Sequence, residues 1–142
     1  MQHDTGRRLQ EKIRRIPREL KVDSRGWLLK VLNGREEDLP SQPGEVYLTL
    51  ALPGHSRGNH LHARTDEWFT VLQGMAKVAL QDQATGERLD LTLAAEKPET
   101  LYVPAGVAHV FTNPSDAKTP LLIVAYASRP YDPTDVFASQ LL

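Results

Sequence analysis

Short runs of alternating apolar and polar residues, separated by turn residues, cover most of this chain of 142 residues. Alternation with a period of two places the apolar side chains on one face of a β-strand. Glycine, proline and asparagine between the runs are typical of turns. So many short strands in a small chain predict a sandwich or a barrel, and the jelly roll is the usual closed solution. The runs that we expect to form strands are residues 27–32, 45–52, 60–62, 68–72, 76–80, 89–93, 100–103, 107–112 and 121–128.

The two ends of the chain differ from this pattern. Leu9, Ile13 and Ile16 are spaced at i, i+4 and i+7, which predicts a short amphipathic helix that ends at Pro17. Its basic residues would form a solvent-exposed face, unless the segment packs on a second subunit. The apolar C-terminal end is expected to pack back on the barrel. The expected organisation is therefore a helical extension, residues 1–20, and a single barrel, residues 21–142.

Composition restricts the partners and the chemistry. Hydrophobic residues make up 40% of the chain and charged residues 25%, with a formal net charge of −1, which predicts neither nucleic acid nor an anionic membrane as a partner. No apolar run approaches the length of a membrane span, so we expect a cytoplasmic protein. The exposed sheet edges of a small barrel favour a homodimer. The chain has no cysteine, so a metal would have to be held by histidine and carboxylate side chains.

Three histidines and one glutamate occupy positions that strands could bring together. His60 and His62 are two residues apart, so a strand places both imidazoles on one face. Glu67 follows after enough residues for a turn, and His109 follows a Pro-x-Gly turn that leads into another apolar run. Burying these polar side chains unpaired would cost several kcal/mol, and a divalent transition metal would satisfy them together. Zinc, iron, manganese or nickel suits such ligands better than magnesium or calcium.

The same residues fall into two motifs. Gly54-x5-His60-x-His62-x4-Glu67-x6-Gly74 resembles the first cupin motif at every position, and Pro104-x-Gly106-x2-His109-x3-Asn113 resembles the second. Pro98 stands where the second motif usually opens with glycine. The resemblance to the cupin superfamily implies an all-β, single-domain jelly-roll barrel. It also implies metal binding by His60, His62, Glu67 and His109; the alternative is a cupin that has kept the fold and lost the metal.

A narrower resemblance rests on three further segments. Residues 23–28, 57–62 and 127–133 are similar to segments of cupins that act on nucleotide sugars. The middle one, Arg57-Gly58-Asn59-His60-Leu61-His62, resembles a run in the dTDP-sugar ketoisomerases and in the C-terminal cupin domain of capsule-sugar epimerase/reductases. This resemblance implies a sugar-nucleotide isomerase or epimerase of surface-polysaccharide biosynthesis, with a nucleotide sugar as its small-molecule ligand.

Such a reaction removes a proton next to a ketone and returns it, so it needs a base and an acid. The resemblance implies His60 or His62 as the base, and Tyr47, Tyr102 or Tyr126 on the strands could supply a phenol acid. If all three motif histidines bind a metal, the base would instead be a metal-bound hydroxide, Glu67 or His55. Arg57 suits a diphosphate group. We expect Arg57, Asn59 and Trp68 to bind the substrate.

Two other functions remain open at this point. Three histidines and one glutamate also suit a metal-dependent iron oxygenase that acts on a small organic substrate. A non-catalytic cupin that binds a small molecule is the other alternative. Sugar processing predicts a wide, polar pocket mouth with Arg57 pointing inward, an oxygenase predicts a small apolar pocket, and a binding module predicts no free acid or base near the ligand.

Overall fold

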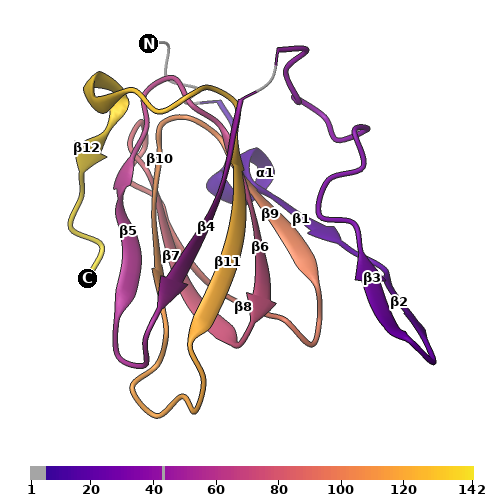
Figure 1. Cartoon of the computed structure of the whole chain (residues 1–142). Helices are drawn as coiled ribbons and strands as arrows, with labels where there is room; N and C mark the ends of the chain where they lie inside the picture. The colour runs from indigo at the N-terminus through magenta and orange to yellow at the C-terminus, as the bar shows by residue number, and fades with distance from the viewer. Residues whose placement is uncertain (1–5, 43) are drawn as a thin grey trace.

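Two five-stranded antiparallel sheets face each other and enclose the apolar core (Figure 1). The structure is a computed structural model that describes residues 6–42 and 44–142. The first sheet has the order β1 (Arg14–Pro17), β9 (Glu99–Val103), β6 (Glu67–Gln73), β11 (Leu121–Ala127) and β4 (Glu45–Ala51). The second has the order β12 (Phe137–Ala138), β5 (Ser56–Leu61), β10 (Val107–Thr112), β7 (Met75–Asp82) and β8 (Arg88–Ala94). The prediction of an all-β jelly-roll barrel is confirmed.

Alternation along the strands supplies the core, as the sequence pattern predicts. In β11, buried residues alternate strictly with half-buried ones, and Phe69 and Val71 of β6 lie in the same central cluster. A smaller apolar cluster joins Leu61 and Val110 to Leu141 near the C-terminus. Because β12 also pairs with β5, the C-terminal end packs back on the barrel as expected.

The N-terminal segment differs from its prediction. The helix α1 covers only Leu9–Lys12, whereas Arg14–Pro17 form β1 and pair with β9, so the helical prediction is wrong for β1. Leu9 and Ile13 lie in the main core cluster, which makes the segment part of the barrel. A one-turn helix gains little stability by itself. Pairing at a sheet edge gives hydrogen-bond partners to backbone N–H and C=O groups that would have none in a helix ending at proline. Residues 1–5 of the predicted extension lie outside the described residues.

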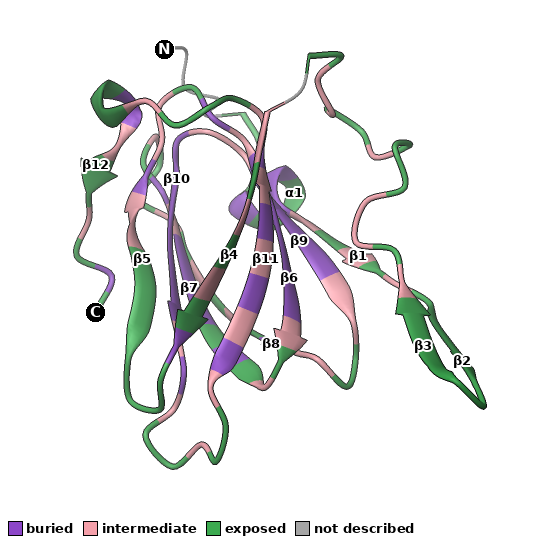
Figure 2. Ribbon diagram, in the orientation of Figure 1, coloured by how far each residue is buried: buried purple, intermediate pink, exposed green. Residues whose placement is uncertain are grey.

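A two-stranded hairpin projects from the barrel next to β1 (Figure 2). It consists of β2 (Leu20–Asp23) and β3 (Gly26–Leu29). The strand predicted over residues 27–32 therefore begins one residue earlier, at Gly26, and ends three residues earlier, at Leu29. All residues of the two strands are exposed except Leu29, which is half-buried. A single hairpin is marginally stable in water, and this one carries apolar side chains on its surface, among them Trp27.

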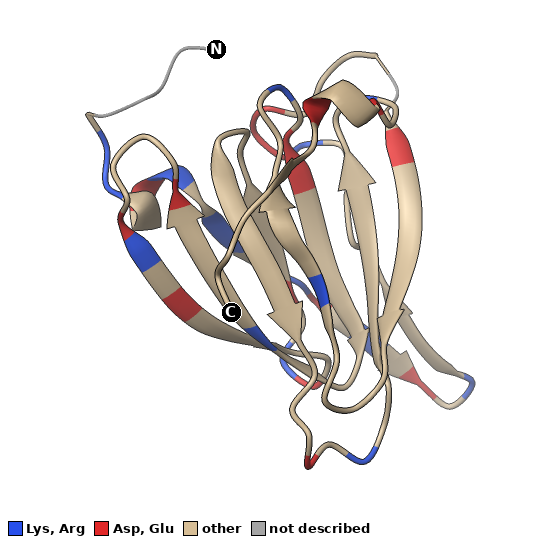
Figure 3. Ribbon diagram, turned by 90° about the vertical axis from the view of Figure 1, so that its left-hand side faces the viewer, with Lys and Arg blue, Asp and Glu red and all other residues tan. Residues whose placement is uncertain are grey.

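In the ribbon of Figure 3, basic and acidic positions both occur, most of them in loops and toward the ends and edges of the strands. Two buried ion pairs, Lys12–Asp82 and Arg18–Glu36, attach the N-terminal part of the chain to the barrel and to the loop after β3. In residues 6–42 and 44–142, no helix has the length and apolar character that a membrane span requires.

Candidate active site

The paired histidines lie at the end of β5, facing the barrel interior. His60 is opposite His109 of β10, and Val110 is opposite Gly58, so Asn59 is an extra residue that forms a β-bulge. Gly58 has a φ of 97°, and a Cβ atom there would lie 2.8 Å from the carbonyl oxygen of His109. Glycine therefore permits the close approach of β5 and β10 that aligns the two histidines.

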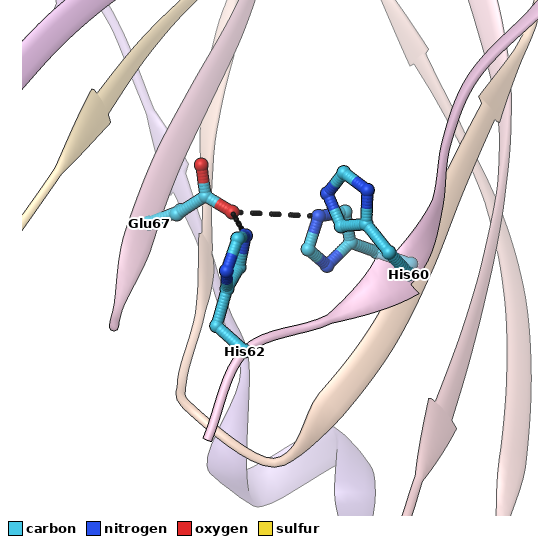
Figure 4. Close-up of side chains that lie close together, drawn as sticks. His60, His62 and Glu67 are labelled. Carbon is cyan, nitrogen blue, oxygen red and sulfur yellow. Dashed lines mark ion pairs between the residues drawn. The ribbon is translucent and has the colours of Figure 1, made fainter. Parts of the chain in front are cut away.

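Glu67 reaches the same point from the other sheet, because it is the first residue of β6. One ligand atom from each of His60, His62, Glu67 and His109 lies within 4.8 Å of the other three. Figure 4 shows the Glu67 carboxylate and the imidazoles of His60 and His62 pointing into a common space. The structure thus brings together all four residues that the cupin resemblance implies as metal ligands.

Two of the imidazoles have their orientation fixed by backbone carbonyls. His62 Nδ1 lies 3.0 Å from the Asp135 carbonyl oxygen, and His109 Nδ1 lies 3.3 Å from that of Val107. A carbonyl oxygen can only accept, so Nδ1 carries the proton in each ring, and Nε2 of the neutral ring presents a lone pair. The free lone pairs therefore lie on the side of each ring away from these carbonyls, on nitrogen atoms that are 3.0 and 3.4 Å from Glu67 Oε1.

A buried carboxylate oxygen lies close to the same two Nε2 atoms. Glu67 Oε1 lies 3.0 Å from His62 Nε2 and 3.4 Å from His109 Nε2. Despite these short distances, Oε1 has no donor in hydrogen-bond geometry among the described residues. A proton on His62 would join that ring to Glu67 alone, whereas a metal ion would satisfy Glu67 and both Nε2 atoms together. The four side chains therefore fit a metal ion, which could contact all of them at once.

Burial and neighbouring charges set the protonation states. Burial lowers the pKa of His109 to about 4, and burial followed by the neighbouring His62 lowers the pKa of His60. Burial alone would lower the pKa of His62, but its interaction with Glu67 raises it overall. Burial would likewise raise the pKa of Glu67, but His62, His109 and Tyr47 lower it. His60 and His109 are consequently neutral near pH 7, the form that accepts a proton or binds a metal.

Tyr47 completes the cluster from β4, where it faces inward. Its hydroxyl donates to Glu67 Oε2 at 2.5 Å. Burial raises the pKa of Tyr47 well above its ordinary value, and the Glu67 charge raises it further. The phenol therefore stays protonated and can act only as a donor or an acid. The sequence-based prediction of Tyr47 at the site agrees with this position.

A pocket of about 290 Å³ opens onto the cluster. The barrel contributes Glu45, Tyr47, His60, His62 and Glu67 to its lining. The segment after β11 contributes Arg129, Tyr131, Asp132 and Val136. One wall of the pocket is thus built by the C-terminal segment, which closes over the end of the barrel that carries the histidines.

Two aromatic residues predicted for the site lie elsewhere. Trp68 adjoins Glu67 on β6 and consequently faces the opposite side of the sheet. It packs on Tyr102 and Tyr126, with ring centroids 5.0 and 5.6 Å apart. None of these three lines the pocket. The structure therefore does not place Trp68 and Tyr102 in the pocket, where the sequence-based prediction had them, and Tyr126 lies outside the pocket lining as well.

Two predicted substrate-binding residues and the spare histidine also lie outside the pocket lining. Arg57 is exposed and donates from Nε to the Leu50 carbonyl at 2.8 Å. Asn59, the bulge residue with a φ of 63°, accepts from the Leu141 backbone N–H at 2.9 Å and so anchors the C-terminal end. His55 is exposed in the turn between β4 and β5. Arg57 does not point into the pocket as expected, because it lies near the start of β5 and its side chain is held by the Leu50 carbonyl.

Sequence reasoning missed the pocket wall that the C-terminal segment forms. The segment 127–133, which carries the narrower resemblance, contains Arg129, Tyr131 and Asp132. Its apolar–polar pattern does not indicate which of these side chains faces a site. Asp135, buried beside His62, was missed as well. Its signal is weak: a Pro-Thr-Asp sequence that forms the short 3-10 helix η1 (Pro133–Asp135).

The chain is similar to proteins of polysaccharide and nucleotide-sugar metabolism. It is 27% identical over 116 residues to the spore coat polysaccharide biosynthesis protein SpsL of Bacillus subtilis, covering 78% of this chain and 75% of that protein. It is 30% identical over 91 residues to a UDP-2-acetamido-2,6-beta-L-arabino-hexul-4-ose reductase of Pseudomonas aeruginosa. That match covers 64% of this chain, which spans only 23% of the longer reductase.

A solved structure shows the same fold. The dTDP sugar isomerase from Desulfovibrio desulfuricans superimposes with a TM-score of 0.81 at 22% identity, over 92% of this chain and 85% of the isomerase. The resemblance to nucleotide-sugar-modifying cupins is thereby confirmed at the level of the fold. Residues 21–137 match the sequence profile of the polysaccharide biosynthesis C-terminal domain. Because this match covers most of its length, the chain belongs to the family of polysaccharide biosynthesis C-terminal domains.

Proposed function

We propose that this protein is a sugar-nucleotide isomerase or epimerase of surface-polysaccharide biosynthesis. One observation carries the proposal: a protonated phenol, Tyr47, lines the same pocket as two groups that can accept a proton, the neutral imidazole of His60 and the ionised carboxylate of Glu67. Proton transfer next to a keto group needs an acid and a base in this arrangement. The family and the fold shared with a dTDP sugar isomerase support the same reaction class.

The size of the pocket indicates which part of the substrate enters it. A volume of about 290 Å³ is at the lower limit for a small-molecule site and admits a sugar ring rather than a whole sugar nucleotide. The diphosphate and the base would then lie across the mouth. Arg129 lines the pocket and has the bidentate donor geometry that diphosphates favour, so it takes the role that the sequence suggested for Arg57.

We further propose that His60, His62, Glu67 and His109 hold a divalent transition metal, such as zinc, iron, manganese or nickel. The buried Glu67 oxygen that has no hydrogen-bond donor and lies 3.0 and 3.4 Å from two imidazole nitrogens supports this proposal. Three imidazoles and one carboxylate are a donor set for these metals. A metal bound there would polarise the keto oxygen of a substrate as a Lewis acid.

The chain's own side chains divide the remaining work. Tyr47 lines the pocket with its proton donated to Glu67 Oε2, and it can return a proton to the sugar when the substrate replaces Glu67 as its acceptor and the proton taken from carbon is passed back to the phenol. The half-buried His60 has no hydrogen bond to its ring from the described residues, so its free nitrogen can bind a metal or take a proton, but not both at once. The carbonyl of Asp135 keeps His62 directed at Glu67 in either case.

Deuterium exchange tests the proposed function. Incubation of the protein in D2O with a dTDP- or UDP-4-keto-6-deoxyhexose is expected to add one mass unit at the carbon next to the ketone, because proton removal alone suffices for exchange. Mass spectrometry detects the gain. Binding of the sugar nucleotide without exchange would instead indicate a non-catalytic binding protein. Oxygen consumption with a small organic acid or ketone, and no exchange with any keto sugar, would establish the iron oxygenase.

We also propose that a second copy of the chain covers two exposed apolar surfaces. One is the hairpin, where Trp27 remains 60% exposed, and the other is the outer face of β4, where Leu48 remains 64% exposed. A two-fold arrangement that covers both would bury roughly 800 Å² on each protomer, the size of a standard interface.

Leu48→Glu is accordingly expected to convert a dimer into a monomer, because it places a charge in the centre of the buried face. Light scattering after size exclusion measures the mass. Met75→Glu, which alters an exposed apolar residue at the start of β7, serves as the control and should remain dimeric. A wild-type protein that is monomeric at micromolar concentration would refute the dimer.

A further inference from the structure

The loop between His62 and Glu67 is attached to the C-terminal segment through one residue, Asp135. This residue ends the short helix η1 and is only 2% exposed. A carboxylate buried to this extent must be compensated by hydrogen bonds or by an opposite charge. The side chain of Arg64 approaches to 3.7 Å but is itself half exposed, so most of the compensation comes from other donors.

Those donors are consecutive residues of the loop. Asp135 Oδ1 accepts from the backbone N–H groups of Ala63 and Arg64, each at 2.9 Å. Asp135 Oδ2 accepts from the Thr65 hydroxyl at 2.6 Å. The backbone carbonyl of the same residue accepts from His62 Nδ1 at 3.0 Å. Asp135 thus binds every residue from His62 to Thr65, the connection between two members of the histidine–glutamate cluster.

These contacts fix the direction of the His62 ring. The carbonyl bond selects the tautomer with the proton on Nδ1, and it leaves Nε2 facing Glu67 Oε1 at 3.0 Å. The carboxylate bonds hold the loop backbone so that this carbonyl remains in reach of the ring. Partners of this kind, one shell away from a site, orient its side chains and set their affinity.

We propose that Asp135 is the positioning residue of the site: it holds His62 and the loop 63–65 in the geometry that completes the cluster. The same segment supplies Arg129, Tyr131 and Asp132 to the pocket wall, so Asp135 connects this wall to the cluster. This inference rests on the proposed function, in that His62 acts at the site, and it holds whether His62 binds a metal or acts as a base.

Asp82 provides a matched control for a purely structural role. It is also a buried aspartate, 3% exposed, and it accepts from the backbone N–H of Ala84 at 2.9 Å while pairing with Lys12. It does not line the pocket. Loss of Asp82 should therefore lower the thermal stability at least as much as loss of Asp135, and it should leave the His62 ring unchanged.

The test compares Asp135→Ala, Asp135→Asn and Asp82→Ala with two readouts. The first is Co²⁺ titration, which gives the affinity and the visible absorption spectrum of the bound ion. The second is NMR of the metal-free protein with ¹⁵N-labelled histidine, which reports which ring nitrogen of His62 carries the proton. Melting temperature is recorded for each variant, so that a loss of stability is separated from a loss of geometry.

Asp135→Ala is expected to weaken Co²⁺ binding by about tenfold to a hundredfold, to change the Co²⁺ spectrum, and to remove the Nδ1–H signal of His62. Asp135→Asn should retain more of the Co²⁺ affinity and of the His62 signal, because its amide oxygen still accepts from the backbone N–H groups of Ala63 and Arg64. If Asp135→Ala does not fold, Asp135→Asn takes its place in the comparison. Asp82→Ala should match wild type in both readouts.

A wild-type His62 signal and wild-type Co²⁺ affinity in Asp135→Ala would overturn the proposal, even if its melting temperature falls. If the wild-type protein binds no Co²⁺, the metal part of the proposed function fails, and the His62 signal still decides the role of Asp135.

Discussion

Replacing Glu67 with glutamine is expected to lower the affinity for a divalent transition metal by on the order of a hundredfold or more. Removal of a residue that only orients a ligand already costs about tenfold to a hundredfold, and Glu67 would be a ligand itself. The substitution removes the one negative charge of the cluster while preserving the shape of the side chain and an oxygen that accepts from Tyr47. Titration with Zn²⁺ or Co²⁺ against a chelating dye measures the affinity.

A second consequence concerns stability. A metal at a hundred times its dissociation constant stabilises the native protein by about 2.7 kcal/mol, so added metal should raise the melting temperature of the wild type and not that of Glu67→Gln. Glu99→Gln is the matched control, because Glu99 pairs with Arg15 on β1 and does not line the pocket. Equal metal affinity in the wild type and in Glu67→Gln would refute the proposed ligand set.

His60→Ala is expected to reduce deuterium exchange into a keto sugar nucleotide by at least about a hundredfold, the lower range for a general acid–base group. The expectation holds whether His60 binds the metal or takes the proton, because its ring lines the pocket. The centroid of this ring is 5.0 Å from the ring centroids of His62 and His109. Initial rates of mass gain in D2O give the comparison.

His55→Ala is the control for this variant, because it also removes an imidazole and His55 is exposed outside the pocket lining. It should exchange at the wild-type rate. Comparable losses in His55→Ala and His60→Ala would show that the pocket is not where the proton is removed.

The cluster could be predicted from the sequence because its geometry is local. Spacing by two places His60 and His62 on one strand face, and the turns before Glu67 and His109 return the chain to the same barrel end. The same rule, applied consistently, would have excluded Trp68, which adjoins Glu67 on the strand. It could not have excluded Arg57, because the bulge at Asn59 shifts the alternation between Arg57 and His60.

Other parts of the structure depend on contacts between distant segments. The N-terminal segment has a helical sequence pattern, but Arg14–Pro17 pair with β9 as a strand. The free energy gained from edge pairing and from burial of Ile13 is larger than the helix propensity of a single turn. The pocket wall depends on how the C-terminal segment crosses the barrel end, which Asp135 and Asn59 determine through backbone contacts far apart in the sequence. Periodicity carries no information about such contacts.

If the four-residue cluster and its pocket form one metal-dependent site for proton removal from a keto sugar nucleotide, exchange must depend on the bound metal. The most direct measurement is deuterium exchange by the same protein sample before chelation, after chelation and after reloading with metal. Exchange is expected to fall to the background rate on chelation and to return on reloading. Exchange that continues unchanged in the metal-free protein would contradict it, and would make His60 an imidazole base rather than a ligand.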